Sequence, residues 1–441
     1  FIIVDAIKGE RGLPTLSIEA RYQFTISEFL RIARRGCPLD AQVHIGECQD
    51  PRDFNGGWDK ILVLENADIS TWSAGELGAL EQGEDAVVNE TIDLNAFDLY
   101  ELKQIFFSEL AAAEVTGEVI AVVICDSVQC GICGIPSTGC QTFFAITEQQ
   151  VASPGLPAEL IFSEDAGATI GETNVSTLGA DEDPSGMACV GTNLVVISND
   201  DCGLHYAPLA DILLGTEVWT RIATGLECPA GAPNAIFSLG SAFTWIVGDG
   251  GYVYFSSDIT AGVSVQNAGV ATVENLLDIH GVDENNLVAV GESNAVVFTT
   301  DGENWGSVTG PSVGIDLTAV WMKSALEWFV GDIQGNLFYT QDAGATWTTK
   351  AFPGSGAGVI RDIVFATPTV GYMAHSIVGP AGRILRTIDG GNSWYVLPEG
   401  TTTLPVNDYI NSIAVSGECP NDLYAGGLAA NATDGFLVKG A

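Results

Sequence analysis

The second half of the chain repeats one short phrase, TQDAGATW at Thr340–Trp347, TIDGGNSW at Thr387–Trp394 and a one-residue-shorter TTDGENW at Thr299–Trp305. The copies return at intervals of about 41 to 47 residues, which is long enough for one four-stranded sheet per repeat. In each copy an Asp precedes Gly or Ala-Gly, so that a carboxylate can accept backbone N–H groups and Gly can supply a positive φ. The Trp that follows anchors the returning strand. The phrase therefore predicts a hairpin turn that recurs once per sheet.

Weaker copies of the phrase extend the repeat toward both ends of this region. They lie at Ser163–Ile170, Asn199–Tyr206, Ser256–Asp258 and Thr433–Gly435, which makes seven copies in all. Three apolar runs precede most copies, and with the returning strand they make one propeller blade. We therefore predict a mainly β chain with a seven-bladed β-propeller over residues 142–441. We interpret the following side chains as structural parts of the turns: Asp165, Asp201, Asp301, Asp342, Asp389, Trp305, Trp347 and Trp394.

This pattern resembles the Asp-box, or BNR, repeat of β-propellers. Two segments, Val247–Asp258 and Arg386–Trp394, are most similar to proteins described as photosystem II stability/assembly factor-like. The resemblance implies a chaperone-like propeller that holds a membrane-protein client through a patch of arginines. The predicted propeller contains few arginines, namely Arg221, Arg361, Arg383 and Arg386, which counts against that particular surface.

The first 140 residues predict a separate, small α+β domain. Thr25 and Glu28 form a capping box for a short helix that ends near Arg35, and a second helix is predicted from Asn95 through Leu110. Strand-like runs occur at residues 43–45, 60–65, 86–92 and 118–125. Segments such as Ala33–Gly46 and Glu65–Glu84 resemble virion structural proteins of tailed bacteriophages. That resemblance implies an assembly or attachment domain that joins identical copies.

Four cysteines lie close together where the two predicted domains meet: Cys125, Cys130, Cys133 and Cys140. Four thiolates could bind one structural zinc ion, and the spacing of Cys130 and Cys133 is that of a zinc half-site. Two local disulfides, or free buried thiols, are the alternatives, and Cys37 with Cys48 and Cys189 with Cys202 are further possible pairs. We predict no other cofactor.

The chain is strongly acidic, with a formal net charge of −40. Residues 1–140 contribute −14 and the remainder −26. Such a surface repels the phosphates of nucleic acids, so we expect no sequence-specific nucleic acid binding. No run of about 18 apolar residues occurs, and we expect no membrane span.

Catalytic patterns are sparse in this sequence. Asp-box propellers include sialidases, which bind the substrate carboxylate with three arginines, and the few arginines here do not provide such a set. No GxSxG, HExxH or Walker motif occurs, and we interpret the four histidines as structural. We therefore predict a protein that is not an enzyme.

Together these features predict a structural and interaction protein, a repeated subunit of a phage-like particle or tail tube. Residues 1–140 would self-associate into a ring, tube or shell, and the propeller would be displayed on the outside of a virion or extracellular particle. It could there bind a host-surface glycan or protein. The alternatives are the assembly-factor type of propeller and a surface adhesin, for which Trp245, Trp321 and Trp328 could line a sugar site.

Overall fold

The structure is a computed structural model of the 441-residue chain. It describes the strands of the N-terminal part by their backbone, at residues 2–4, 15–22, 39–46, 58–74, 88–95 and 98–102. The remaining described residues are 107–110, 115, 117–125, 142–148, 158–179, 182–200, 202–222, 225–240, 243–376, 382–397, 409–415, 422–428 and 435–440.

The chain divides into two compact units, residues 1–104 and 105–441. The division precedes the predicted boundary near residue 140. Strands β7 (Phe107–Glu109) and β8 (Val119–Ile124), which the sequence analysis assigned to the first domain, pair instead with strands of the propeller. The described part of the cysteine-rich segment thus lies within the propeller.

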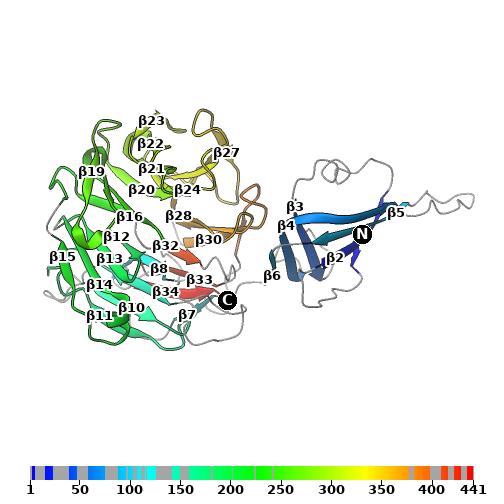
Figure 1. Cartoon of the computed structure of the whole chain (residues 1–441), viewed down its shortest axis with the longest axis horizontal. Coiled ribbons are helices and arrows are strands. Elements are labelled where there is room, and N and C mark those ends of the chain that lie inside the picture. The colour runs from blue at the N-terminus through cyan, green and yellow to red at the C-terminus, as the bar shows by residue number, and fades with distance from the viewer. Residues whose placement is uncertain are drawn as a thin grey trace, which may run out of the picture. The chain divides into compact units, whose positions relative to one another are not determined.

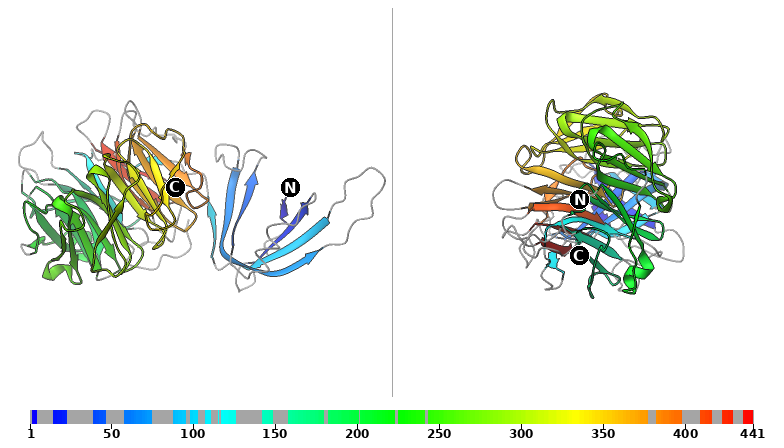
Figure 2. Two further views of the ribbon diagram at one scale, coloured as in Figure 1. Left: turned by 90° about the horizontal axis from the view of Figure 1, so that it is seen from above. Right: turned by 90° about the vertical axis from the view of Figure 1, so that its left-hand side faces the viewer.

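The N-terminal unit is built around one long strand, β4 (Trp58–Ala74), seen in Figure 1 and from two further directions in Figure 2. Its first half pairs with two strands and its second half with a third, so that six strands form one sheet. The others are β1 (Ile2–Val4), β2 (Thr15–Tyr22), β3 (Leu39–Gly46), β5 (Val88–Asn95) and β6 (Asp98–Leu102).

The helix predicted from Asn95 is wrong. Residues 98–102 form β6, which pairs with β4 so that Leu99 lies opposite Leu64 and Leu102 opposite Ile61. The same residues fit a helical period, but pairing with a long neighbouring strand overrides this local preference. The shorter helix predicted near Thr25 lies outside the described residues.

The second unit is a seven-bladed β-propeller, and each blade is a four-stranded antiparallel sheet. Blades 1 to 3, from the innermost strand outward, comprise β8, β9 (Phe143–Thr147), β10 (Glu159–Ser163) and β11 (Gly171–Asn174); β12 (Gly186–Val190), β13 (Asn193–Ser198), β14 (Gly203–Pro208) and β15 (Thr220–Ile222); and β16 (Pro233–Leu239), β17 (Phe243–Gly248), β18 (Tyr252–Ser256) and β19 (Ser264–Ala268). Blades 4 to 6 comprise β20 (Leu276–Gly281), β21 (Leu287–Gly291), β22 (Ala295–Thr299) and β23 (Gly306–Thr309); β24 (Leu317–Met322), β25 (Trp328–Asp332), β26 (Leu337–Thr340) and β27 (Thr348–Lys350); and β28 (Val359–Phe365), β29 (Gly371–Ser376), β30 (Gly382–Thr387) and β31 (Tyr395–Val396).

Blade 7 closes the ring with strands from both ends of the unit. It consists of β32 (Tyr409–Val415), β33 (Leu423–Leu428) and β34 (Gly435–Gly440), with β7 as its outermost strand. Figure 1 shows β7 and β8 beside β33 and β34. The backbone N–H of Leu110 donates to the carbonyl of Leu437 at 3.0 Å, just beyond the paired residues. The innermost strands contact one another in sequence order, and β32 contacts β8.

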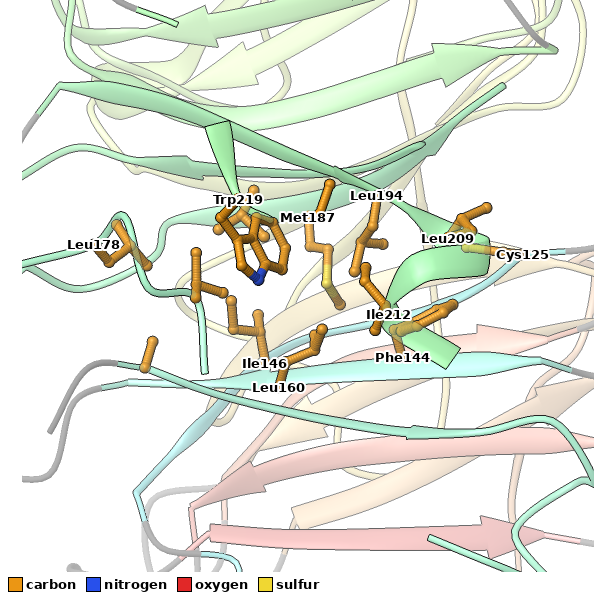
Figure 3. Packing of buried hydrophobic residues seen from close by; sticks show 14 residues of the cluster. Cys125, Phe144, Ile146, Leu160, Leu178, Met187, Leu194, Leu209, Ile212 and Trp219 are labelled. Carbon is orange, nitrogen blue, oxygen red and sulfur yellow. The ribbon is translucent and has the colours of Figure 1, made fainter. Parts of the chain in front are cut away.

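Successive side chains of a strand point to opposite faces of its blade, so one strand contributes to the interfaces with both neighbouring blades. On β17, Trp245 and Val247 belong to the core between blades 3 and 4, whereas Ile246 belongs to the core between blades 2 and 3. The core between blades 1 and 2 also receives Leu209 and Ile212 from the short helix α2 (Leu209–Leu213), as Figure 3 shows. Three 3₁₀ turns, Asp249–Gly251, Ile259–Ala261 and Glu292–Asn294, complete the described helical segments.

Five of the seven predicted turns lie where they were expected, between the third and fourth strands of blades 1, 3, 4, 5 and 6. The copy at Asn199–Tyr206 is different, because it spans the connection between β13 and β14, the second and third strands of blade 2. Helix α2 occupies the connection after β14 instead. The copy at Thr433–Gly435 falls mostly outside the described residues and directly precedes β34.

Candidate functional site

The carboxylate of each described Asp turn is bound within its own turn. In blade 5, Asp342 accepts hydrogen bonds from the backbone N–H and the hydroxyl of Thr346 at 2.8 and 2.6 Å. The hydroxyl of Thr340 donates to Asp342 and accepts from the N–H of Gly344, at 2.8 and 3.0 Å. Equivalent bonds surround Asp165, Asp301 and Asp389, while Asp201 lies outside the described residues.

The hydrogen bonds of three of these turns, those of Asp165, Asp301 and Asp342, stabilise the charged form of the Asp. Side-chain and backbone donors hold the pKa of Asp301 and Asp342 below the usual range. Burial opposes this at Asp165, but the bonds from Thr169 outweigh it and its pKa is also lowered. A carboxylate with a lowered pKa is a weak base, and the oxygens of these three groups bond within their own turns.

The tryptophans after the turns contact neighbouring strands. The indole N–H of Trp347 donates to the carbonyl of Thr309 at 3.0 Å, and that of Trp305 donates to the side chain of Gln266 at 3.1 Å. Trp394 is buried among aromatic residues of blades 5 and 6, including Phe329 and Phe365. Each therefore fixes an outer strand to an adjacent blade or core.

Polar side chains on the innermost strands join adjacent blades. Asp278 on β20 accepts from the backbone N–H of Val320 at 2.7 Å, and Asp362 on β28 accepts from that of Ile413 at 2.8 Å. Nδ1 of His280 accepts from the N–H of Met322 at 3.1 Å, and its ring stacks on Trp321. Because each acceptor bonds to the next blade, these residues hold the ring closed around the axis.

Asp278 and Asp362, which we call the acid pair, both have raised pKa values. Both are closely surrounded by protein, although each side chain keeps some accessible surface. Burial and the charge of Asp362 raise the pKa of Asp278 to about 8, and burial raises that of Asp362 to about 6. Burial lowers the pKa of His280 to about 3, so its ring is neutral at neutral pH. One proton is therefore retained by this acid pair near neutrality.

The described cysteines form pairs that the sequence did not predict. Cys125 forms a disulfide with Cys189, and Cys202 forms one with Cys228. Cys125 directly follows β8 and Cys189 lies on β12, the innermost strands of blades 1 and 2, so their Cα atoms are 5.7 Å apart. This excludes Cys125 from the predicted zinc set, and it excludes the Cys189–Cys202 pair. Cys130, Cys133 and Cys140 lie outside the described residues, as do Cys37 and Cys48.

The part of the chain that the structure describes shows no group of His, Cys, Asp and Glu side chains that could hold a metal ion. None of its helices is long and apolar enough to cross a membrane.

A pocket lies at the interface of blades 3 and 4, with a cavity volume of about 480 Å³. This is within the range of small-ligand pockets. Blade 3 provides Phe243, Trp245, Phe255 and Gln266. Blade 4 provides its Asp turn, Asp301–Glu303, and the loop residues Glu284 and Asn285.

Aromatic rings form the apolar side of this pocket. Ring centroids of Phe243 and Phe255 are 5.9 Å apart with the rings stacked, and Trp245 lies 5.2 Å from Phe255. Phe243 and Phe255 keep exposed surface, whereas only 1% of Trp245 is exposed. Trp328 is wholly buried and Trp321 partly buried, which supports packing over sugar binding for the three tryptophans.

The acidic side of the pocket is held by two hydrogen-bonded turns. Asp283 caps the first by accepting from the N–H groups of Asn285 and Asn286, both at 2.8 Å. Asp301 caps the second through the N–H of Glu303 at 3.0 Å. The side chains of Glu284 and Glu303 are exposed at the pocket.

The sequence predicts Asp301 as part of a turn, but it gives no direct sign of the pocket around this residue. Phe243, Phe255 and Gln266 belong to other strands, and only the blade interface brings them to the turn. Gln266 connects the two sides, because its amide donates to the carbonyl of Gly302 at 2.8 Å and accepts from Trp305. The aromatic residues Phe243, Trp245 and Phe255 were a signal in the sequence for this pocket. Strands of a hydrophobic core carry the same kind of residues, so the signal is not specific.

Solved structures share the propeller fold at low sequence identity. YCF48 from Cyanidioschyzon merolae matches with 14% identity and a TM-score of 0.55, covering 76% of this chain and 98% of its own. YCF48 bound to D1 peptide matches with 14% identity and a TM-score of 0.54 over 77% and 97% of the two chains. Inactive virginiamycin B lyase from Staphylococcus aureus with quinupristin matches with 11% identity and a TM-score of 0.56 over 76% and 98%. No protein-family model matches, and neither does any curated protein.

Proposed function

We propose that this chain is a non-enzymatic interaction protein whose propeller binds a segment of a partner protein. The observation that carries the proposal is the open pocket between blades 3 and 4. It combines exposed aromatic surface with polar groups on a rigid framework, as binding sites do. The structure thus favours the assembly-factor type of propeller among the alternatives drawn from the sequence.

Two further observations support binding rather than catalysis. One structural neighbour is a propeller in complex with a peptide, YCF48 with D1 peptide. Another neighbour is a lyase, but in this chain the acid pair and His280 are hydrogen-bonded to the next blade. These bonds give the three side chains a structural role at the blade interfaces.

The role in a phage-like particle stays a prediction, as does its location in a virion. The N-terminal unit supports self-association in one respect, since β1 lies at the edge of its sheet and pairs only with β2 among the described strands. An open edge can pair with another copy of the chain. Binding of a host-surface glycan also stays a prediction.

The test is a selection with the full-length chain immobilised and an mRNA-displayed library of random twelve-residue peptides. We expect enriched peptides that bind the full chain in solution with one site per molecule, measured by isothermal titration calorimetry. A library that yields no binding peptide after repeated rounds would overturn the proposed function.

A further inference from the structure

We infer that the pocket between blades 3 and 4 binds a lysine or arginine side chain presented by a partner protein. This inference rests on the proposed function and gives the chemistry of its site. The occupant is cationic because an aromatic surface and carboxylates converge on one cavity, and none of the lining residues is basic.

Charge is the first argument. Three of the nine lining residues are acidic, Glu284, Asp301 and Glu303, and all three side chains are exposed. The hydrogen bonds of Asp301 keep it ionised, since they hold its pKa well below the usual range. Glu284 and Glu303 have no hydrogen bond to their carboxylates in the described structure, so both are available to a ligand. A cation entering the pocket would meet two free carboxylates and a third fixed negative charge.

The aromatic rings supply the second argument. Phe255 packs against both Phe243 and Trp245, with ring centroids 5.9 and 5.2 Å apart, and it retains exposed surface at the pocket. A guanidinium or ammonium group over a ring face is attracted by the ring quadrupole, more strongly where water is excluded. The methylene groups of lysine or arginine would cover the apolar surface that this cluster leaves exposed.

The rigidity of the rim is the third argument. Asp283 and Asp301 cap the turns that carry Glu284 and Glu303, and Gly302 fits against the carbonyl of Glu284 with a positive φ of 72°. A side chain at position 302 would meet that carbonyl oxygen at 2.2 Å. The backbones of the two turns that carry the glutamates therefore hold each other in place. This lowers the conformational entropy that the glutamates lose when a ligand binds.

The experiment repeats the peptide selection and then compares variants of the full chain. We expect enriched peptides to share a lysine or arginine whose replacement by norleucine weakens binding by about tenfold or more. The double variant Glu284→Gln/Glu303→Gln, which keeps the shape of the rim, should weaken the same peptides by about tenfold or more and reduce the salt dependence of binding.

Two further variants separate charge from shape. Phe255→Leu keeps apolar bulk but removes the ring, and we expect binding about three- to tenfold weaker. The control Glu164→Gln/Glu172→Gln removes two exposed carboxylates from blade 1 and should bind like the unaltered chain. Circular dichroism melting of every variant shows whether the fold is retained.

The outcomes distinguish this inference from the proposed function. Peptides that bind without a shared basic residue, or that bind equally to the glutamine and leucine variants, would overturn the inference and leave peptide binding intact. Loss of binding in the blade 1 control to the same extent would attribute the effect to overall charge and also overturn it. A glycan array signal abolished by Phe255→Leu, with no peptide bound, would overturn both.

Discussion

At the scale of single residues, the Ser or Thr hydroxyl at the start of an Asp turn bonds both to the Asp carboxylate and to a backbone N–H of the turn. Thr387 is wholly buried, donates to Asp389 at 2.9 Å and accepts from the N–H of Gly391 at 2.9 Å. Sequence alone identified this Thr-x-Asp-Gly pattern, because turn chemistry is local. It did not predict that Gly391 would fit against the ring of Phe329 in blade 5.

Replacement of Thr387 by Val should destabilise the propeller. The isosteric change leaves the N–H of Gly391 without its acceptor in a buried site, which costs about 1 to 3 kcal/mol of unfolding free energy. Thr387→Ser keeps the hydroxyl and should cost less. Urea unfolding followed by tryptophan fluorescence measures both. Equal stability of the Val variant and the unaltered chain would mean that the hydroxyl bonds contribute nothing net.

At the scale of elements, the prediction was accurate where pattern and repeat agreed. The three apolar runs predicted to precede the copy at Thr340–Trp347 correspond to β24, β25 and β26. The number of blades was also correct. The errors arose where an element depends on distant partners: β6 pairs with β4, and β7 pairs with the last strand of the chain. No local periodicity encodes such pairing.

The disulfide between blades 1 and 2 yields a prediction at this scale. Cys125→Ala/Cys189→Ala should lower the unfolding free energy by about 2 to 4 kcal/mol, because the unfolded chain loses the constraint between residues 64 apart. Urea unfolding measures the loss. Mass spectrometry of the unreduced parent should detect a peptide linked through Cys125 and Cys189. A peptide linking Cys125 to Cys130, Cys133 or Cys140 would contradict the structure.

At the scale of the whole molecule, pH acts on the propeller through two sets of carboxylates. Asp165, Asp301 and Asp342 have lowered pKa values, so their contribution to the unfolding free energy is present above about pH 4, the pKa of an unfolded Asp, and is lost as the pH falls. The acid pair, Asp278 and Asp362, has raised pKa values, so the folded state retains a proton that the unfolded chain has released. Its contribution is lost as the pH rises toward about 8.

The unfolding free energy should therefore fall as the pH rises from about 5 to about 9. The growing repulsion of a chain with a net charge of −40 acts in the same direction. Asp278→Asn/Asp362→Asn removes the titrating pair and should flatten the slope, whatever its effect on stability at a single pH. Urea titrations at several pH values measure both slopes. If the unfolding free energy depends on pH equally in the double variant and the unaltered chain, the acid pair is not the cause of that dependence.

The pairing of β7 with β34 affects how the chain can fold during its synthesis. During synthesis Phe107–Glu109 leaves the ribosome more than 300 residues before its partner, Gly435–Gly440. The nascent chain therefore carries an unpaired β7 until Gly435–Gly440 has been synthesised, while the six earlier blades can already stack. A truncation that removed Gly435–Gly440 would leave β7 without its partner strand and β33 with one unpaired edge.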